Sequence, residues 1–171
     1  MSGAADEFDD ERNTAVGPKI GWQYTPPALA DMTTEECAVV LSGPRPTVLL
    51  PLGALGPRGP HLPLGAGALC ADECAKRSVR ELRRAGISAA VAPALTYGVA
   101  RLGSGFAGAV SLSPAAVEHV VRELCWAYRS EGFGLVCVID LGHEPEQIAA
   151  ATRAVDGTRA AAGGAVFAHP L

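Results

Sequence analysis

Short apolar runs alternate with longer segments of helical periodicity along most of this chain. The apolar runs cover residues 47–52, 87–92, 135–139 and 165–168, and Gly or Pro stands near most of their ends. Runs without polar alternation are typical of strands buried on both faces of a parallel sheet. The pattern therefore predicts four strands.

The segments between these runs carry apolar residues at helical spacing. A short helix begins at Thr33 or Thr34, supported by Glu36, and a second covers residues 68–85. Ser113-Pro114 and Pro145 begin two further helices, since proline is favoured in a first helical turn. Strands separated by helices imply right-handed crossovers, so the predicted fold class is α/β, a three-layer sandwich with a mainly parallel sheet.

Composition limits the classes of protein that this chain fits. Its 171 residues, 49% of them hydrophobic, can bury one substantial core. The net charge of -4 gives no cationic field, which argues against a nucleic-acid partner, and no apolar stretch approaches the ~20 residues of a membrane span. The acidic residues of segment 1–20 predict a disordered tail, and residues 21–171 form the predicted domain.

The cysteines indicate a reducing compartment, so we expect a cytoplasmic protein. Five of them, an odd number, lie in apolar or helical segments: Cys37, Cys70, Cys74, Cys125 and Cys137. Cys70 and Cys74 are four residues apart and share a helix face, but no second pair completes four ligands for a soft metal. We expect them to be packing thiols.

Ligands of open α/β sheets bind beyond the carboxyl ends of the strands. Segments 53–67, 93–111 and 140–146 meet there in the predicted fold. Six of their residues are candidates for lining a ligand pocket: Arg58, His61, Tyr97, Ser111, Asp140 and His143.

Several motifs in these segments stand in the order that one family carries. They are Gly59-Pro60-His61-Leu62-Pro63-Leu64, Tyr97-Gly98, the segment Phe106-Ala107-Gly108-Ala109-Val110-Ser111-Leu112-Ser113, Gly132-Phe133 and Gly142-His143. Together they resemble the creatininase family of metal-dependent amidohydrolases, whose first loop reads Thr-Glu-x-His-Gly-Pro-His-Leu-Pro-Leu-x-Thr-Asp. The resemblance implies a creatininase-like fold whose C-terminal part is missing from this sequence.

The resemblance also implies that one or two zinc or manganese ions bind at the site. In this chain, however, three of the positions that hold metal ligands in the family carry residues that cannot bind a metal ion. The positions of the family's Glu, His and bridging Asp read Gly56, Arg58 and Gly67, and His143 alone remains. A guanidinium has no lone pair for a metal and repels a cation. We therefore expect no cofactor, no metal and no confident catalytic residue.

An alternative retains zinc or manganese at a rearranged site. His143 would be joined there by Glu144, Glu146 and Asp140. Both glutamates also suit the first turn of a helix, where the macrodipole favours negative charge.

Three interpretations compete. In the first, the chain is a non-catalytic family member that binds a small molecule, or binds a partner as a homo-oligomer or beside an active paralogue, because the family is typically oligomeric. In the second, the rearranged site hydrolyses a cyclic or linear amide. In the third, the chain is a decayed or truncated gene product without a defined activity.

Overall fold

The computed structural model describes residues 21–23 and 25–169, so the predicted acidic tail at residues 1–20 lies outside the described residues. The helices and strands, in chain order, are η2 (Leu29–Asp31), α1 (Thr34–Ser42), β1 (Thr47–Leu52), α2 (Ala66–Arg84), β2 (Ala89–Val91), η3 (Arg101–Gly103), α3 (Pro114–Ser130), β3 (Leu135–Asp140), α4 (Pro145–Ala162) and β4 (Ala165–Ala168).

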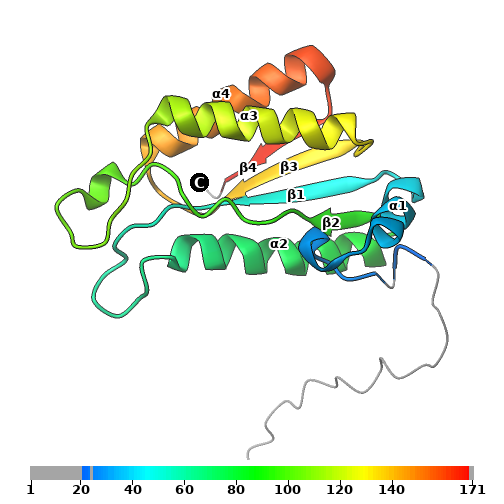
Figure 1. The fold of residues 1–171 in the computed structure, drawn as a ribbon, viewed down its shortest axis with the longest axis horizontal. Helices are drawn as coiled ribbons and strands as arrows, with labels where there is room; N and C mark the ends of the chain where they lie inside the picture. The colour runs from blue at the N-terminus through cyan, green and yellow to red at the C-terminus, as the bar shows by residue number, and fades with distance from the viewer. Residues whose placement is uncertain (1–20, 24, 170–171) are drawn as a thin grey trace, which may run out of the picture.

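The four strands form one parallel sheet in the order β2-β1-β3-β4. Helix α2 lies on one face of the sheet, and α3 and α4 lie on the other (Figure 1). The structure thus confirms an α/β three-layer sandwich. Among the described helices, none combines the length and apolar character needed to cross a membrane.

Local sequence signals begin the helices as expected. The Thr33 hydroxyl accepts from the Glu36 N–H (3.2 Å), and the Glu36 carboxylate accepts from the Thr33 N–H (2.8 Å), which makes a capping box. Ser113 accepts from the Ala116 N–H at 3.2 Å and Pro114 occupies the first turn of α3.

The core is divided by the sheet into two clusters. On the α3 and α4 side, side chains of β1 and β3 such as Val48 and Val136 pack against Val117, Val121 and other buried residues of the helices. On the α2 side, a smaller cluster joins Leu49 and Ile139 to Ala75 and Val79. Leucine, valine and alanine therefore fill both layers, as the continuous apolar runs predict.

Pro51 lies inside β1, although β1 is a central strand. Thr47, two turns of the alternation before Pro51, donates its N–H toward the β2 side, to Ser88 O at 2.8 Å. The N–H that proline lacks at position 51 would therefore also point toward the β2 side. The register of the β1–β2 pair ends at Leu49 and Val91, so strand β2 has already ended where the N–H of Pro51 is missing. The carbonyl of Pro51 still accepts from Leu95 N–H at 2.9 Å.

Some predictions differ from the structure. Strand β2 comprises only Ala89–Val91, shorter than the expected 87–92, and α2 begins two residues earlier than expected. The expectation that Cys70 and Cys74 are packing thiols is wrong for Cys70, which is exposed. Helical spacing indicates which residues share a face, but the face of α2 that carries Cys70 projects beyond the strands that the helix covers.

Cys125 is buried and Cys137 is half-buried, and both pack as hydrophobic residues. Burial raises the pKa of Cys125 to about 11. Burial also raises the pKa of Cys137, with a further contribution from the nearby Cys74. Neither thiol is activated for nucleophilic chemistry, because a raised pKa lowers the thiolate fraction at neutral pH.

Candidate functional site

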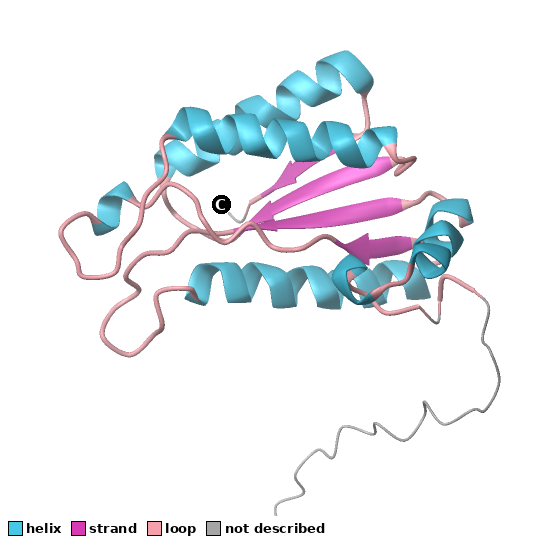
Figure 2. Ribbon diagram, in the orientation of Figure 1, coloured by secondary structure: helices cyan, strands magenta, loops and turns pink. Residues whose placement is uncertain are grey.

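The candidate site lies where the chain leaves the carboxyl ends of the central strands. From β1 the chain crosses to β2 over one face of the sheet, while β3 lies on the other side of β1 and connects through the opposite layer. Loops that follow β1 and β3 therefore diverge and leave a crevice between them. Figure 2 shows the long loops gathered at this end of the molecule.

A pocket of about 140 Å³ occupies this crevice. It is lined by three loops and the first turn of α4: Ala54, Gly56, Pro57, Arg58, Val99, Ala100, Leu102, Gly103, Gly142, His143, Glu144 and Gln147. Its volume corresponds to four or five waters at roughly 30 Å³ each, so it suits a small ligand.

Arg58 crosses this pocket from the loop after β1 toward the loop after β3. Its Nη2 lies 3.0 Å from the place that a Cβ at Gly67 would take, and 3.5 Å from the place of a Cβ at Gly142. The side chain is half-buried, and no hydrogen bond or ion pair joins its guanidinium to any residue in the ranges 21–23 and 25–169. A positive charge thus stands between the first turn of α2 and the end of β3.

Asp140 is buried, with 1% of its surface exposed, and its carboxylate braces the loop that follows β3. Its Oδ1 accepts from the Gly142 N–H at 2.8 Å, and its Oδ2 accepts from Gln147 Nε2 at 3.1 Å. Gln147 Oε1 in turn accepts from the Val99 N–H at 2.8 Å. Gln147 therefore ties together the loops that follow β2 and β3.

Sequence reasoning missed Gln147. A glutamine in the first turns of a helix is usually solvated, yet this one is 99% buried because only 1% of its surface is exposed. The available signal was its helical position, at the start of α4 beside the long loop that it fixes.

The two glutamates of the alternative metal site bind the loop after β2. Glu144 Oε2 accepts from the Leu102 N–H at 3.0 Å, and Glu146 pairs with Arg101 at 3.1 Å. Glu146 Oε2 is buried and has no hydrogen-bond partner among the described residues. Both carboxylates hold the η3 turn against α4, so they have a structural role in the loop.

His143 lines the pocket and is exposed. Its ring meets the ring of His169 edge to face, with centroids 6.1 Å apart. His169 follows β4, and its Nε2 lies 2.6 Å from the Gly142 carbonyl. An imidazole from β4 thus fixes the backbone beside His143.

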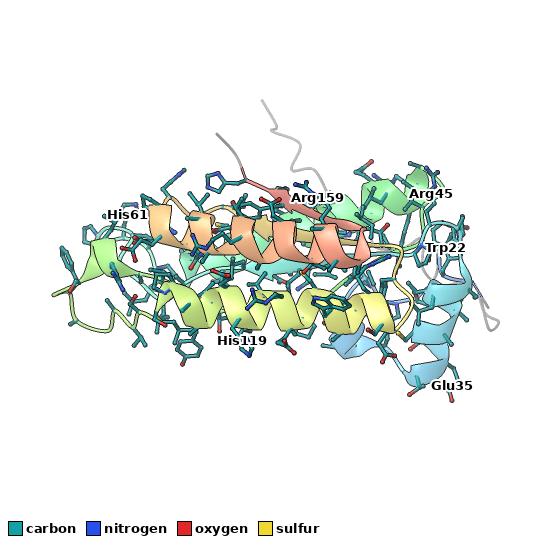
Figure 3. The ribbon with its side chains drawn as sticks, turned by 90° about the horizontal axis from the view of Figure 1, so that it is seen from above. Trp22, Glu35, Arg45, His61, His119 and Arg159 are labelled. Carbon is teal, nitrogen blue, oxygen red and sulfur yellow. The ribbon has the colours of Figure 1, made fainter. Side chains whose placement is uncertain are left out.

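The other pocket candidates lie outside the pocket lining. His61 is exposed and its ring lies against Gly59, 3.1 Å from the place of an added Cβ; Figure 3 labels it at the loop end of the molecule. Tyr97 is 52% exposed. The Ser111 hydroxyl accepts from the Ala100 N–H at 3.0 Å and donates to the Leu112 carbonyl at 3.1 Å. Arg58 and His143 therefore line the pocket, Asp140 is buried behind it beside Gly142, and the other three lie outside it.

The described residues do not fit the divalent ion that the fold implies. Metal hydrolases need at least three anchored ligands and an open coordination position. No group of three or more His, Cys, Asp or Glu side chains among residues 21–23 and 25–169 could hold a metal ion. The Arg58 guanidinium stands beside Gly67, and a guanidinium cannot coordinate a cation.

Comparison with solved structures shows that creatininases share this fold. A structure described as creatininase with manganese superposes with a TM-score of 0.74 at 21% identity, covering 85% of this chain and 58% of that one. A creatinine amidohydrolase superposes equally well at 19% identity, covering 84% of this chain and 57% of that one.

The sequence profile of the creatininase family, described as creatinine amidohydrolase, matches residues 30–169. This chain belongs to the creatininase family.

Two curated relatives share the name mycofactocin precursor peptide peptidase. The protein of Mycolicibacterium smegmatis is 38% identical over 79 residues, which are 46% of this chain and 32% of that protein. The protein of Mycobacterium tuberculosis is 32% identical over 94 residues, which are 49% of this chain and 38% of that protein. The matches thus span only about a third of the length of these relatives.

Proposed function

We propose that this chain is a creatininase-family protein that does not perform metal-dependent hydrolysis and instead binds a small anion at Arg58. One observation carries the proposal. The Arg58 guanidinium lies between Gly67 and Gly142, within the crevice at the sheet's carboxyl edge. A cation fixed in that place opposes a divalent ion and attracts an anion.

The chemistry of Arg58 favours a planar or tetrahedral oxyanion. Its five N–H donors form a rigid fork that binds a carboxylate or phosphate through two parallel hydrogen bonds. The N-terminal turn of α2 adds the positive end of a helix dipole, since Gly67 is the second residue of that helix and lies beside Nη2. His143 at the pocket mouth offers a further donor.

Pocket size and wall chemistry restrict the ligand further. The walls beside Arg58 are largely backbone, glycine and small apolar side chains, such as Ala54, Val99 and Ala100. A volume of about 140 Å³ admits a carboxylate or phosphate with a few further atoms. We infer a small anionic metabolite as the ligand class.

Hydrolysis of an amide is the second candidate, because the curated relatives are named as peptidases. It would require His143, Glu144, Glu146 and Asp140 to collect a metal ion after rearrangement. Glu144 and Glu146 are bound to the η3 turn, and Asp140 is bound to Gly142 and Gln147. Such a rearrangement would have to release all three carboxylates from these partners.

Metal analysis of the purified protein separates the two candidates. We expect zinc and manganese well below one equivalent, and no change in either after His143→Ala. A near-stoichiometric ion that is lost in His143→Ala would overturn the non-catalytic proposal and support the hydrolase.

Thermal unfolding with inorganic phosphate or acetate tests anion binding, with sodium chloride at equal ionic strength as the reference. At a hundredfold excess over Kd, binding stabilises the folded state by about 2.7 kcal/mol. For a chain of this size, the melting temperature then rises by roughly 5–10 °C. We expect Arg58→Gln to lose this rise and the matched variant Arg80→Gln, at an exposed position on α2, to keep it.

Equal responses of the two arginine variants to both anions would refute the anion site. Assembly as a homo-oligomer, or with an active paralogue, belongs to the same proposal, and sedimentation equilibrium of the purified chain measures it.

A further inference from the structure

The wall of the Arg58 pocket has few hydrogen-bond donors left for a ligand. Most backbone N–H groups that surround the pocket already donate to acceptors within the protein, and four of them donate to side chains. These bonded N–H groups belong to Gly56, Val99, Ala100, Leu102, Gly103 and Gly142. The guanidinium of Arg58 is thus the principal donor that this wall offers a ligand.

This scarcity of donors distinguishes two kinds of anion. A phosphate carries more than one negative charge at neutral pH, on oxygens that point in several directions, and proteins commonly bind it with several backbone N–H groups at once. A carboxylate has two oxygens in one plane, and the fork of a single arginine can bind both. Arg58 by itself is therefore sufficient for a carboxylate and insufficient for a phosphate.

The first turn of α2 does not supply the missing donors. Gly67 of this turn lies beside Nη2 of Arg58, yet none of the described residues that line the pocket belongs to α2. The helix dipole raises the positive potential at the guanidinium, which favours every anion alike. It does not compensate for phosphate oxygens that would face the wall without a partner.

A carboxylate of the protein itself also lines the pocket. Glu144 Oε2 accepts from the Leu102 N–H at 3.0 Å, and this bond holds the carboxylate in the wall. Its charge repels any anion beside Arg58, and the repulsion grows with the charge of the ligand. The pocket therefore favours an anion with a single charge.

The rest of the wall is largely apolar. Its apolar side chains come from Ala54, Pro57, Val99, Ala100 and Leu102. Contact with such a wall removes the methylene groups of a ligand from water, and each methylene then raises the affinity about fourfold. An aliphatic group next to the carboxylate thus adds affinity.

The volume of the pocket limits the length of that aliphatic group. The space of about 140 Å³ holds about five or six non-hydrogen atoms, since each takes slightly less than the ~30 Å³ of a liquid water. The carboxylate accounts for about half of these atoms, which leaves room for about two or three further carbons.

We propose that the ligand of this pocket is a short aliphatic monocarboxylate of about three or four carbon atoms. Arg58 binds its carboxylate through two parallel hydrogen bonds, and its aliphatic end lies against the apolar wall, where Leu102 contributes a side chain. The inference rests on the anion site proposed above and adds the chemical class of the ligand.

A series of straight-chain carboxylates tests this assignment. Acetate, propionate, butyrate and pentanoate are titrated into the isotope-labelled full chain at constant ionic strength, and Kd is measured from the amide shifts in two-dimensional NMR spectra. We expect the affinity to rise about fourfold per methylene from acetate to butyrate, and less than about twofold from butyrate to pentanoate, because the pocket is then full. Inorganic phosphate should bind at least about tenfold more weakly than butyrate.

A matched pair of leucine variants tests the contact with the aliphatic end. Leu102 is 74% exposed and lines the pocket, so we expect Leu102→Ser to lower the affinity for butyrate about fourfold and to leave that for acetate within about twofold. Leu62 is 48% exposed and lies outside the pocket lining, so Leu62→Ser should change neither affinity. Both leucines are exposed, so folding is retained in each variant.

Glu144→Gln tests the selection for a single charge. The variant keeps an acceptor for the Leu102 N–H and removes the negative charge from the wall. We expect it to raise the affinity for phosphate at least about threefold more than the affinity for butyrate, because the lost repulsion was larger for the ligand with more charge.

The outcomes separate this inference from the anion site on which it rests. If Arg58→Gln binds butyrate and phosphate as tightly as the wild type does, the anion site itself is wrong. If both anions need Arg58 but phosphate binds as tightly as butyrate, or the affinity does not change along the series, only the monocarboxylate assignment is wrong. Free alanine adds an amino group to propionate, and tenfold tighter binding of alanine would overturn the assignment in favour of an amino acid whose ammonium group meets Glu144.

Discussion

Replacement of Gln147 by leucine tests the bridge that holds the site loops together. Leucine has a similar volume, so the change opens no large cavity, but it removes the acceptor for the Val99 N–H and the donor to Asp140 Oδ2. A buried polar group left without a partner costs about 1–3 kcal/mol, and the cost is greater for a charged group. The two losses together predict a destabilisation of about 3–5 kcal/mol.

That loss is a large share of the total stability, since domains unfold with about 5–15 kcal/mol. The melting temperature should fall by roughly 10 °C for a chain of this size. Urea unfolding followed by circular dichroism measures the free energy directly, and an unchanged m value shows that the two-state comparison holds. The matched variant Gln23→Leu changes an exposed glutamine and should stay within about 0.5 kcal/mol of wild type.

Gln147→Glu sharpens the test, because it keeps an acceptor for Val99 and places a second carboxyl beside Asp140. Two neighbouring carboxyls raise the pKa of the introduced group in the folded state above its unfolded value of about 4. The Gln147→Glu variant is therefore most stable below about pH 4, where the introduced carboxyl is protonated, and its free energy of unfolding declines as the pH rises through the folded-state pKa of that carboxyl. Two results together would refute the bridge as a stabilising element. Gln147→Leu would lower the free energy of unfolding by less than about 1 kcal/mol, and the stability of Gln147→Glu would not depend on pH.

Two further changes probe close packing and capping. Gly98→Ala puts a methyl group 2.0 Å from Gln147 Oε1 and 2.3 Å from the Gly53 carbonyl, so we expect the free energy of unfolding to fall by about 3 kcal/mol. Gly157→Ala lies in an open part of α4 and should raise it by about 0.5–1 kcal/mol in the same urea titration. Thr33→Ala removes the capping box of α1 and should cost about 1 kcal/mol, and a change below about 0.3 kcal/mol would show that this helix end is held by other contacts.

The predictable part of this fold is the part that local chemistry decides. Strands β1 and β4 match the predicted ranges, because each is an apolar run next to Gly or Pro: Pro46 and Gly53 flank β1, and Gly164 precedes β4. The caps at Thr33 and Ser113 also follow from residues within one helical turn. These features depend on neighbours in sequence.

The unpredicted part depends on segments that are distant in sequence. The apolar run of β3 indicates burial on both faces, and yet Leu135 and Cys137 are only half-buried and border an open hollow, because α2 lies mainly over β1 and β2. Gln147 reads as a helix residue like any other until its partners Val99 and Asp140, from two other loops, surround it. Neither fact is encoded in a local pattern.

Arg58 and two glycines beside its guanidinium form one packing arrangement. Gly67 and Gly142 have no side chains, and the space that a Cβ would take at each lies within 3.0 and 3.5 Å of Arg58 Nη2. The long side chain at position 58 thus fits because the two glycines leave room for it. An aspartate restored at position 67 alone would meet this guanidinium and pair with it, because the opposite charges would be almost in contact. An aspartate at position 67 would therefore be a poor ligand for a metal ion unless Arg58 were replaced as well.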